Sequence, residues 1–139
     1  DQLQALRPDQ IGGLTSLAPL GQAKLQALTV EQIAGLSPAA VAGLTTAQID
    51  ALSADQIEAL TETQTAHLTA AQLAAMAMED LERFSTGDIA AISTTAITGL
   101  AVDHIAGLSA GQVSAFTQVQ VNAMTEDQVN ALLAAYQEF

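Results

Sequence analysis

The segment LTTAQIDALSADQIEAL at residues 44–60 contains two copies of the unit from which the chain is built. Each copy has eight residues and runs from a Ser or Thr to a Leu: TTAQIDAL at 45–52 and SADQIEAL at 53–60. Outward from these copies the same frame holds without a gap from residue 21 to residue 132, which gives fourteen consecutive octads. Self-similarity at a fixed period is the signature of a repeat array.

The octads share the pattern S/T-x-x-Q-I/V-x-A/G-L, whose positions we number one to eight. Position eight is large and apolar in all fourteen, and position five is apolar in all but one, where Thr65 stands. Upstream, RPDQIGGL (7–14) is a further octad, and DQLQAL (1–6) matches positions three to eight of another. The six-residue unit TSLAPL (15–20) interrupts the frame, and residues 133–139 continue past the last octad as a helix extension or cap. Because no shift in composition separates these parts, the sequence predicts one array over residues 1–139.

The spacing of the large apolar residues favours short helices. It alternates between three and five residues, whereas a strand with one buried face needs a spacing of two. On a helix, a spacing of three leaves Ile49 and Leu52 on one stripe. A single long helix fits poorly, because the stripe would rotate around it from octad to octad. We therefore expect one helix of about six or seven residues per octad, followed by a sharp bend.

Position one carries the signal that starts each helix. A Ser or Thr hydroxyl at the N-cap accepts a hydrogen bond from a backbone N–H that has no partner in the helix, and Gln at the third helical position can reach back to the N–H of the cap. Proline at the first helical residue (Pro38, Pro8) and acids in the first turn support this frame. The predicted structural caps are Thr29, Ser37, Thr45, Ser53, Thr61, Thr69, Ser85, Ser93, Ser109, Thr117 and Thr125.

Positions five and eight supply the predicted core. The residue before each cap and the fourth residue of the helix form a hydrophobic staple, as Leu52 and Ile57 would around Ser53. The predicted core residues are Ile33, Leu36, Val41, Leu44, Ile49, Leu52, Ile57, Leu60, Leu68, Leu73, Ile89, Ile97, Leu100, Ile105, Leu108, Val113, Val121, Val129 and Leu132.

Position seven, Ala or Gly in most octads, predicts a second contact. It lies nearly opposite the apolar stripe, so its small side chain indicates that another helix backbone passes close by. Helices this short cannot stand alone and must be held by neighbours. The predicted fold class is all-α: a solenoid or superhelix with one very short helix per octad and positions two, three and six largely in water.

The composition excludes several kinds of partner. Fifteen Asp and Glu residues stand against three basic ones, for a formal net charge of -12. Such a surface repels phosphate groups, so we expect no binding to nucleic acid, and no apolar run is long enough for insertion into a membrane. The chain has no cysteine, which removes disulfides and thiol chemistry.

The candidate residues for chemistry all have a structural explanation. His67 stands at a small-residue position and His104 at a Gln position, where it can act as a hydrogen-bonding substitute near the cap; neither has the spacing of metal ligands. The acids are explained as a solvated face, and no D-x-D-x-D-G loop is present, although diffuse binding of calcium or another divalent cation by that face stays open. The sequence predicts no catalytic residues, no metal site and no cofactor, and hence no enzyme.

Tracts such as LTTAQIDALSADQIEAL are similar to the helical repeat arrays of large secreted or surface-attached bacterial proteins, often described as adhesins. The resemblance implies an extracellular or cell-surface location and a structural or adhesive role as stalk, spacer or filament. No binding residues are carried over from it. The alternative is a solenoid that holds a peptide or protein partner in its groove. The octads 77–84 and 85–92 depart from the Gln consensus, which marks either local variation or a candidate contact patch.

The two ends of the array suggest how it assembles. The first octads keep the consensus, and Tyr136 and Phe139 lie in the C-terminal extension, which either closes that end or docks another copy. A solenoid without polar terminal repeats exposes the surface that a neighbour would cover. We therefore expect either a part of a longer array or a subunit that stacks end to end with itself, in a head-to-tail contact that can generate filaments.

Overall fold

The computed structural model describes residues 5–14 and 16–139 of the chain, and within these ranges all regular structure is helical. The opening of the array at residues 1–4 and the first residue of the six-residue unit lie outside the described residues. The elements are α1 (Pro8–Ile11), α2 (Gln22–Gln26), α3 (Val30–Ala34), α4 (Pro38–Ala42), α5 (Thr46–Asp50), α6 (Ala54–Glu58), α7 (Glu62–Thr65), α8 (Ala70–Ala75), α9 (Met78–Leu81), α10 (Thr86–Ala91), the 3₁₀ helix η1 (Ile97–Gly99), α11 (Val102–Gly107), α12 (Ala110–Ala115), α13 (Gln118–Ala123) and α14 (Glu126–Gln137).

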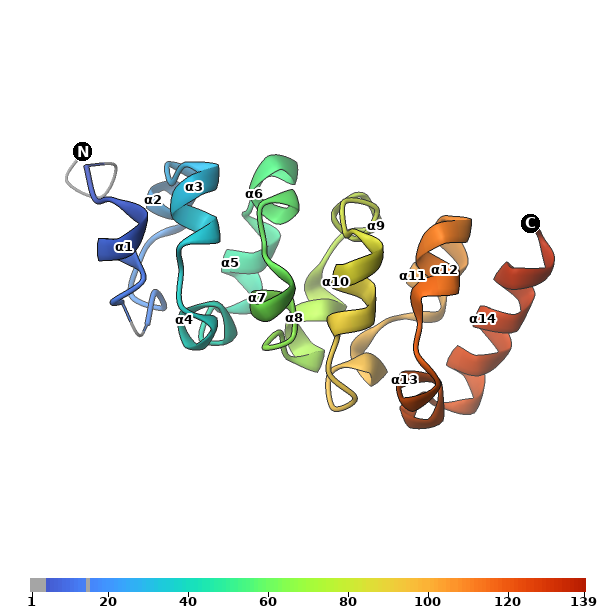
Figure 1. Cartoon of the computed structure of the whole chain (residues 1–139). Helices are drawn as coiled ribbons and strands as arrows, with labels where there is room; N and C mark the ends of the chain where they lie inside the picture. Colours follow the sequence, from blue (N-terminus) through green and yellow to red (C-terminus); the bar gives the residue numbers. More distant parts are fainter. Residues whose placement is uncertain (1–4, 15) are drawn as a thin grey trace.

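One short helix per octad winds into an elongated superhelix, with α1 at one end of the molecule and α14 at the other (Figure 1). The predicted all-α solenoid is confirmed. Each helix packs on the helix three octads along the chain: α3 on α6, α5 on α8 and α7 on α10. With this spacing, each octad away from the ends packs against the turn before it and the turn after it. This is the arrangement of a solenoid.

The helices are shorter than expected, at four to six residues outside α14 and η1. In octad 45–52 the helix occupies positions two to six, and the N–H of Leu52 at position eight then bonds to the carbonyl of Ile49 at position five, at 3.1 Å. This bond spans three residues instead of four, so the last turn tightens to 3₁₀ geometry before the chain bends. The bend then continues into the extended backbone of the next N-cap.

Every predicted cap hydroxyl accepts a hydrogen bond from the backbone N–H three residues later, at 3.1–3.3 Å. Ser93 differs from the other ten because it caps a turn that leads into η1, not an α-helix. These bonds satisfy one of the N–H groups that a helix start leaves without a partner.

The core is a continuous row of apolar, mostly aliphatic side chains from Ile11 to Ala135, and it contains positions five and eight of most octads. Two residues of the predicted core, Val121 and Val129, are only half-buried. Both belong to the last two octads, 117–124 and 125–132, and among the described residues no helix after α14 packs on them.

Neighbouring turns approach each other closely at position seven. A β-carbon on Gly99 would lie within 2.6 Å of the backbone of Ala70, and one on Gly35 would lie within 2.9 Å of Pro8. Both contacts join position seven of one octad to position two of the octad three units earlier. At these two places only glycine allows the observed distance between turns.

Candidate functional site

Buried glutamine side chains join one turn of the superhelix to the next. At position four of an octad, the Gln Oε1 accepts a hydrogen bond from the N–H of its own cap at 2.9–3.0 Å. The Nε2 of the same side chain donates to the backbone carbonyls of positions five and eight in the octad four units earlier, at 2.7–3.0 Å. In five cases it also makes a longer bond to the carbonyl of position six, at 3.2–3.4 Å. We call this series the amide ladder; it consists of Gln48, Gln56, Gln64, Gln72, Gln112, Gln120 and Gln128, together with Gln32, whose Nε2 donates to the carbonyl of Leu6 at 2.7 Å.

The amide ladder determines the pitch together with the helix contacts. Helices pack three octads apart, whereas the amides bond four octads back, so one turn contains between three and four octads. Gln56 illustrates the burial: its side chain is almost inaccessible, and its amide contacts Leu25 and Leu28. A buried amide whose hydrogen-bonding groups are all used adds both stability and a defined register.

Sequence reasoning found only half of this arrangement. It assigned the Gln oxygen to the capping box but missed the donation by Nε2 to the preceding turn. A signal was present: Glu serves a capping box as well as Gln, yet position four contains eight Gln and no Glu in a chain rich in acids. Of these two side chains, only Gln can accept a hydrogen bond through its oxygen and also donate one through its nitrogen, because an ionised Glu only accepts.

The six-residue unit 15–20 keeps its place in this scheme. Leu17 is fully buried, and the amide of Gln48 bonds to the carbonyls of Leu17 and Leu20 at 2.9 and 2.7 Å. These two leucines therefore occupy positions five and eight of an octad. The unit lacks the two residues of positions one and two.

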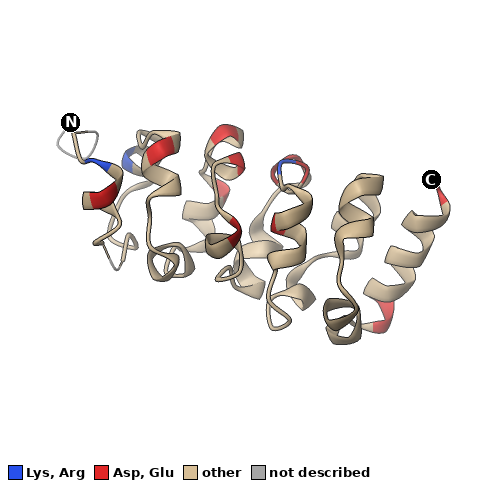
Figure 2. Ribbon diagram, in the orientation of Figure 1, with Lys and Arg blue, Asp and Glu red and all other residues tan. Residues whose placement is uncertain are grey.

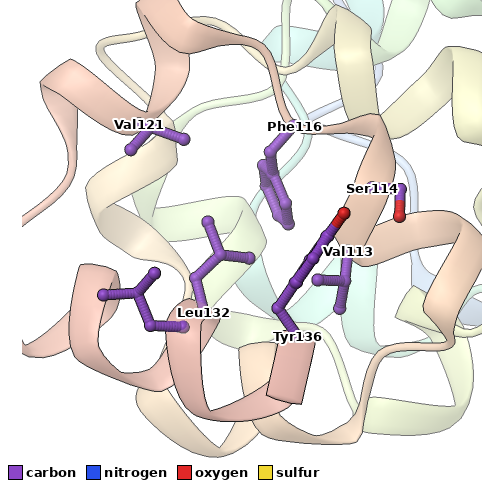
Figure 3. Close-up of a pocket in the computed structure, with 7 residues that line it drawn as sticks. Val113, Ser114, Phe116, Val121, Leu132 and Tyr136 are labelled. Atoms are coloured by element: carbon purple, nitrogen blue, oxygen red, sulfur yellow. The ribbon is translucent and has the colours of Figure 1, made fainter. Parts of the chain in front are cut away.

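An open cavity of about 330 Å³ lies at the C-terminal end, lined by Val113, Ser114, Phe116, Val121, Leu132, Leu133 and Tyr136. It forms because α14 runs straight through residues 133–137, where the other octads bend, and so packs on both α11 and α12. Figure 3 shows the rings of Phe116 and Tyr136 converging on this space, with Leu132 beside them. Leu133 and Tyr136 remain 57% and 63% exposed.

The family profile of the ALTTAQ repeat matches residues 27–62 and 41–70, both within the fourteen octads. This is a repeat protein. No curated protein matches the chain.

Two acids replace Gln in this repeat protein, at positions 80 and 88. Asp88 accepts from the cap of its own octad and from the hydroxyl of Thr65, 3.3 Å away and fully buried. The structure thus pairs two departures from the consensus, since Thr65 is the polar exception at position five. Within the candidate contact patch of octads 77–84 and 85–92, the departure at Asp88 is therefore explained by a contact inside the protein, with Thr65.

Asp80 has no such partner in the part of the chain that the structure describes. There its carboxylate accepts from the N–H of Ala77, at 3.2 Å. Burial raises the pKa of this carboxyl, and the nearby negative charges of Asp50 and Glu79 raise it further, while the bond from Ala77 opposes the shift. Relative to its protonated form, the ionised form of Asp80 is therefore less favourable in the folded chain than in the unfolded chain.

We expect Asp80→Gln to stabilise the protein at neutral pH by about 1–3 kcal/mol, because it removes a buried charge and restores two amide bonds, to Ile49 and Leu52. Since the pKa is raised on folding, the wild-type protein loses stability as pH rises through that pKa, so the gain should shrink in acid. Chemical denaturation at several pH values measures this. Asp88→Gln, the matched control, should gain less, since it leaves Thr65 without its acceptor; equal gains would contradict the assignment.

The histidines have local roles in the structure. The Nδ1 of His104 accepts from the N–H of Ala101 at 3.1 Å, as a Gln oxygen does in other octads. His67 is exposed and lies 2.9 Å from the carbonyl of Thr63. Over the described residues, no cluster of three or more His, Cys, Asp or Glu side chains could hold a metal ion, and no helix has the length and apolarity to span a membrane.

The charges of the repeat protein are distributed unevenly along the superhelix (Figure 2). Two of its three basic residues, Arg7 and Lys24, lie at the N-terminal end. The C-terminal helix α14 and the residue after it carry only acids: Glu126, Asp127 and Glu138. The third basic residue, Arg83, forms an exposed ion pair with Glu58 at 3.4 Å.

Proposed function

We propose that this chain is a non-catalytic structural protein: a stalk, spacer or filament segment that holds two points at a defined separation and associates end to end with its own kind. The observation that carries the proposal is the amide ladder. Because each amide joins turns that are four octads apart, the length of the solenoid is set by the number of octads, and bending it would break buried hydrogen bonds.

The location that fits this role is the bacterial cell surface or the extracellular space, as part of a larger adhesive or filamentous protein. The matches to the ALTTAQ repeat support a repeat array. The absence of cysteine and the acidic surface are compatible with this location. Labelling of the segment by antibody on intact cells tests the location.

The spacer role is tested by a distance across the array. The chain has no native cysteine, so Val30→Cys on α3 and Val119→Cys on α13, both exposed, can be spin-labelled. Pulsed electron paramagnetic resonance on samples diluted with unlabelled protein should give one narrow distance distribution. Deletion of the four octads 61–92 preserves the register and should shorten that distance.

A broad distribution, or a distance that does not change on deletion, would contradict a stiff spacer. A narrow distribution that shifts only when a peptide or protein partner is added would instead favour the binding-module alternative.

A further inference from the structure

Four consecutive octads in the middle of the array interrupt the amide ladder. They span residues 77–108, and the residues that stand at position four in place of Gln are Asp80, Asp88, Ala96 and His104. The ladder is complete in the octads on either side, 45–76 and 109–132. Because each amide bonds four octads back, no ladder glutamine joins residues 77–108 to residues 45–76, and the structure describes every residue of both blocks. We call the boundary between these two blocks the seam.

Helix packing continues across the seam, whereas few hydrogen bonds cross it. The helices α9, α10 and η1 pack on α6, α7 and α8, with the three-octad spacing of the rest of the array (Figure 1). Two hydrogen bonds join the described residues of the two blocks: Thr65 donates to Asp88 at 3.3 Å, and Arg83 donates to Glu58 at 3.4 Å on the surface. At the boundary before the seam, each ladder glutamine of the first block makes two short amide bonds, of 2.7–3.0 Å. The seam is therefore held mainly by packing.

The side chains at position four of the second block do not supply the missing donors. An ionised Asp only accepts hydrogen bonds, and the side chain of Ala has no polar group. His104 accepts from the N–H of Ala101 through Nδ1, and its ring makes no bond to the preceding turn among the described residues. The buried residues whose position-eight carbonyls consequently receive no amide from the second block are Leu52, Leu60, Leu68 and Met76.

An octad elsewhere in the array shows how a missing glutamine can be replaced. Octad 37–44 has Ala at position four, and the hydroxyl of Ser37 donates instead to the carbonyl of Leu14, four units earlier, at 3.0 Å. Octad 93–100 also has Ala at position four, but there the hydroxyl of Ser93 lies 3.1 Å from another hydroxyl of its own octad. At this octad the seam therefore lacks the replacement bond as well as the amide.

Negative charge gathers at the seam (Figure 2). Eight of the fifteen acids lie between residues 50 and 88, and Arg83 is the only Lys or Arg in that stretch. Burial raises the pKa of Asp80, and the negative charge of Asp50 on the other side of the seam raises it further. Where other octads place a donor against the preceding turn, this octad places a like charge, which opposes closure of the seam.

We propose that the seam is a built-in opening point, at which a pulling load separates residues 45–76 from residues 77–108 before either block unfolds. The inference rests on the stalk or spacer role proposed above and adds how such a spacer yields. Without load, the packed helices keep the seam closed and the array keeps its length. Under load, a boundary with few buried hydrogen bonds opens at the lowest force, because local opening costs less free energy there.

Pulling on matched pairs of residues with optical tweezers tests the proposal. The chain has no native cysteine, so handles can be attached at Ala74→Cys and Ala106→Cys, on opposite sides of the seam. The control pair, Ala90→Cys and Asn122→Cys, has the same spacing along the chain, but Gln120 bonds its two octads together. All four residues are exposed and occupy position six. At equal load, the pair across the seam should separate about tenfold faster, as expected for two missing buried hydrogen bonds.

Restoring one ladder residue should remove this difference. His104→Gln places an amide opposite octad 69–76, in the register in which Gln128 bonds to the octad four units before it. It should slow separation of the pair across the seam about tenfold and leave the control pair unchanged. His67→Gln is the matched substitution, because this histidine is exposed and stands at position seven, outside the ladder. It should change neither pair, and circular dichroism shows whether each variant is folded.

Pulling on most of the array shows whether it opens first at the seam. With handles at Val30→Cys and Val119→Cys, a first extension should precede unfolding, and Asp80→Gln together with His104→Gln should shift that extension to a higher load. Equal separation rates for the two matched pairs, or a repaired seam that opens at the same load as the wild type, would overturn the proposal. Either result would leave the spacer role standing, because that role is decided by the distance across the unloaded array.

Discussion

Replacement of Gln56 by alanine should lower the free energy of unfolding by about 2–4 kcal/mol. The substitution removes the acceptor for the N–H of Ser53 and the donor for the carbonyls of Leu25 and Leu28, all in a region almost closed to water. Loss of one partner leaves the other groups buried without hydrogen bonds, which costs more than a typical exposed bond contributes. Urea denaturation followed by circular dichroism measures the difference.

Two substitutions serve as controls for Gln56→Ala. Gln118→Ala makes the same change at an exposed glutamine whose Nε2 donates to the exposed side chain of Asn122, and it should cost a few tenths of a kcal/mol. Ser53→Ala removes the cap alone and should cost about 1 kcal/mol, whereas Ser53→Gly should cost only a few tenths. A loss for Gln56→Ala no larger than that for Ser53→Ala would mean that the bonds between turns contribute nothing.

The second large effect is expected at Leu52. This side chain lies at position eight, belongs to the continuous core and is 6% exposed. Leu52→Ala should destabilise the protein by about 2–5 kcal/mol, because the apolar contacts are lost and neighbouring turns cannot close the cavity completely. Thermal and urea unfolding measure the cost.

Val30→Ala is the control for Leu52→Ala, since Val30 is apolar but 40% exposed at position two. Its cost should stay below about 0.5 kcal/mol. Similar costs at Leu52 and Val30 would contradict the assignment of position eight to the core.

The local structure of each octad followed from its residues. Cap, capping box and staple act within a few residues of one another, so the hydroxyl of Thr45 and the side chain of Gln48 meet wherever the octad lies. The spacing of Ile49 and Leu52 likewise excludes a strand without reference to the rest of the chain. These interactions have short range, and the sequence alone therefore predicted a helix in nearly every octad and the all-α solenoid.

The site at the C-terminal end could not be located in this way. The sequence indicated that residues 133–139 either extend the last helix or dock another copy, but the cavity depends on how α14 lies against α12 and on the ring of Phe116. Similarly, Thr65 and Asp88 read as two unrelated departures until the fold brought their side chains together.

The sequence by itself determined where each helix starts, which residues face the core and that the chain is a repeat. The tertiary structure decided the number of octads per turn, the second role of the glutamines and the cavity beside α14. The reason is distance along the chain: Gln56 and Leu25 are 31 residues apart, and their contact depends on the bend angles summed over four octads. Each bend is set by small side chains between turns, such as Gly99 against Ala70, and no local pattern specifies that sum.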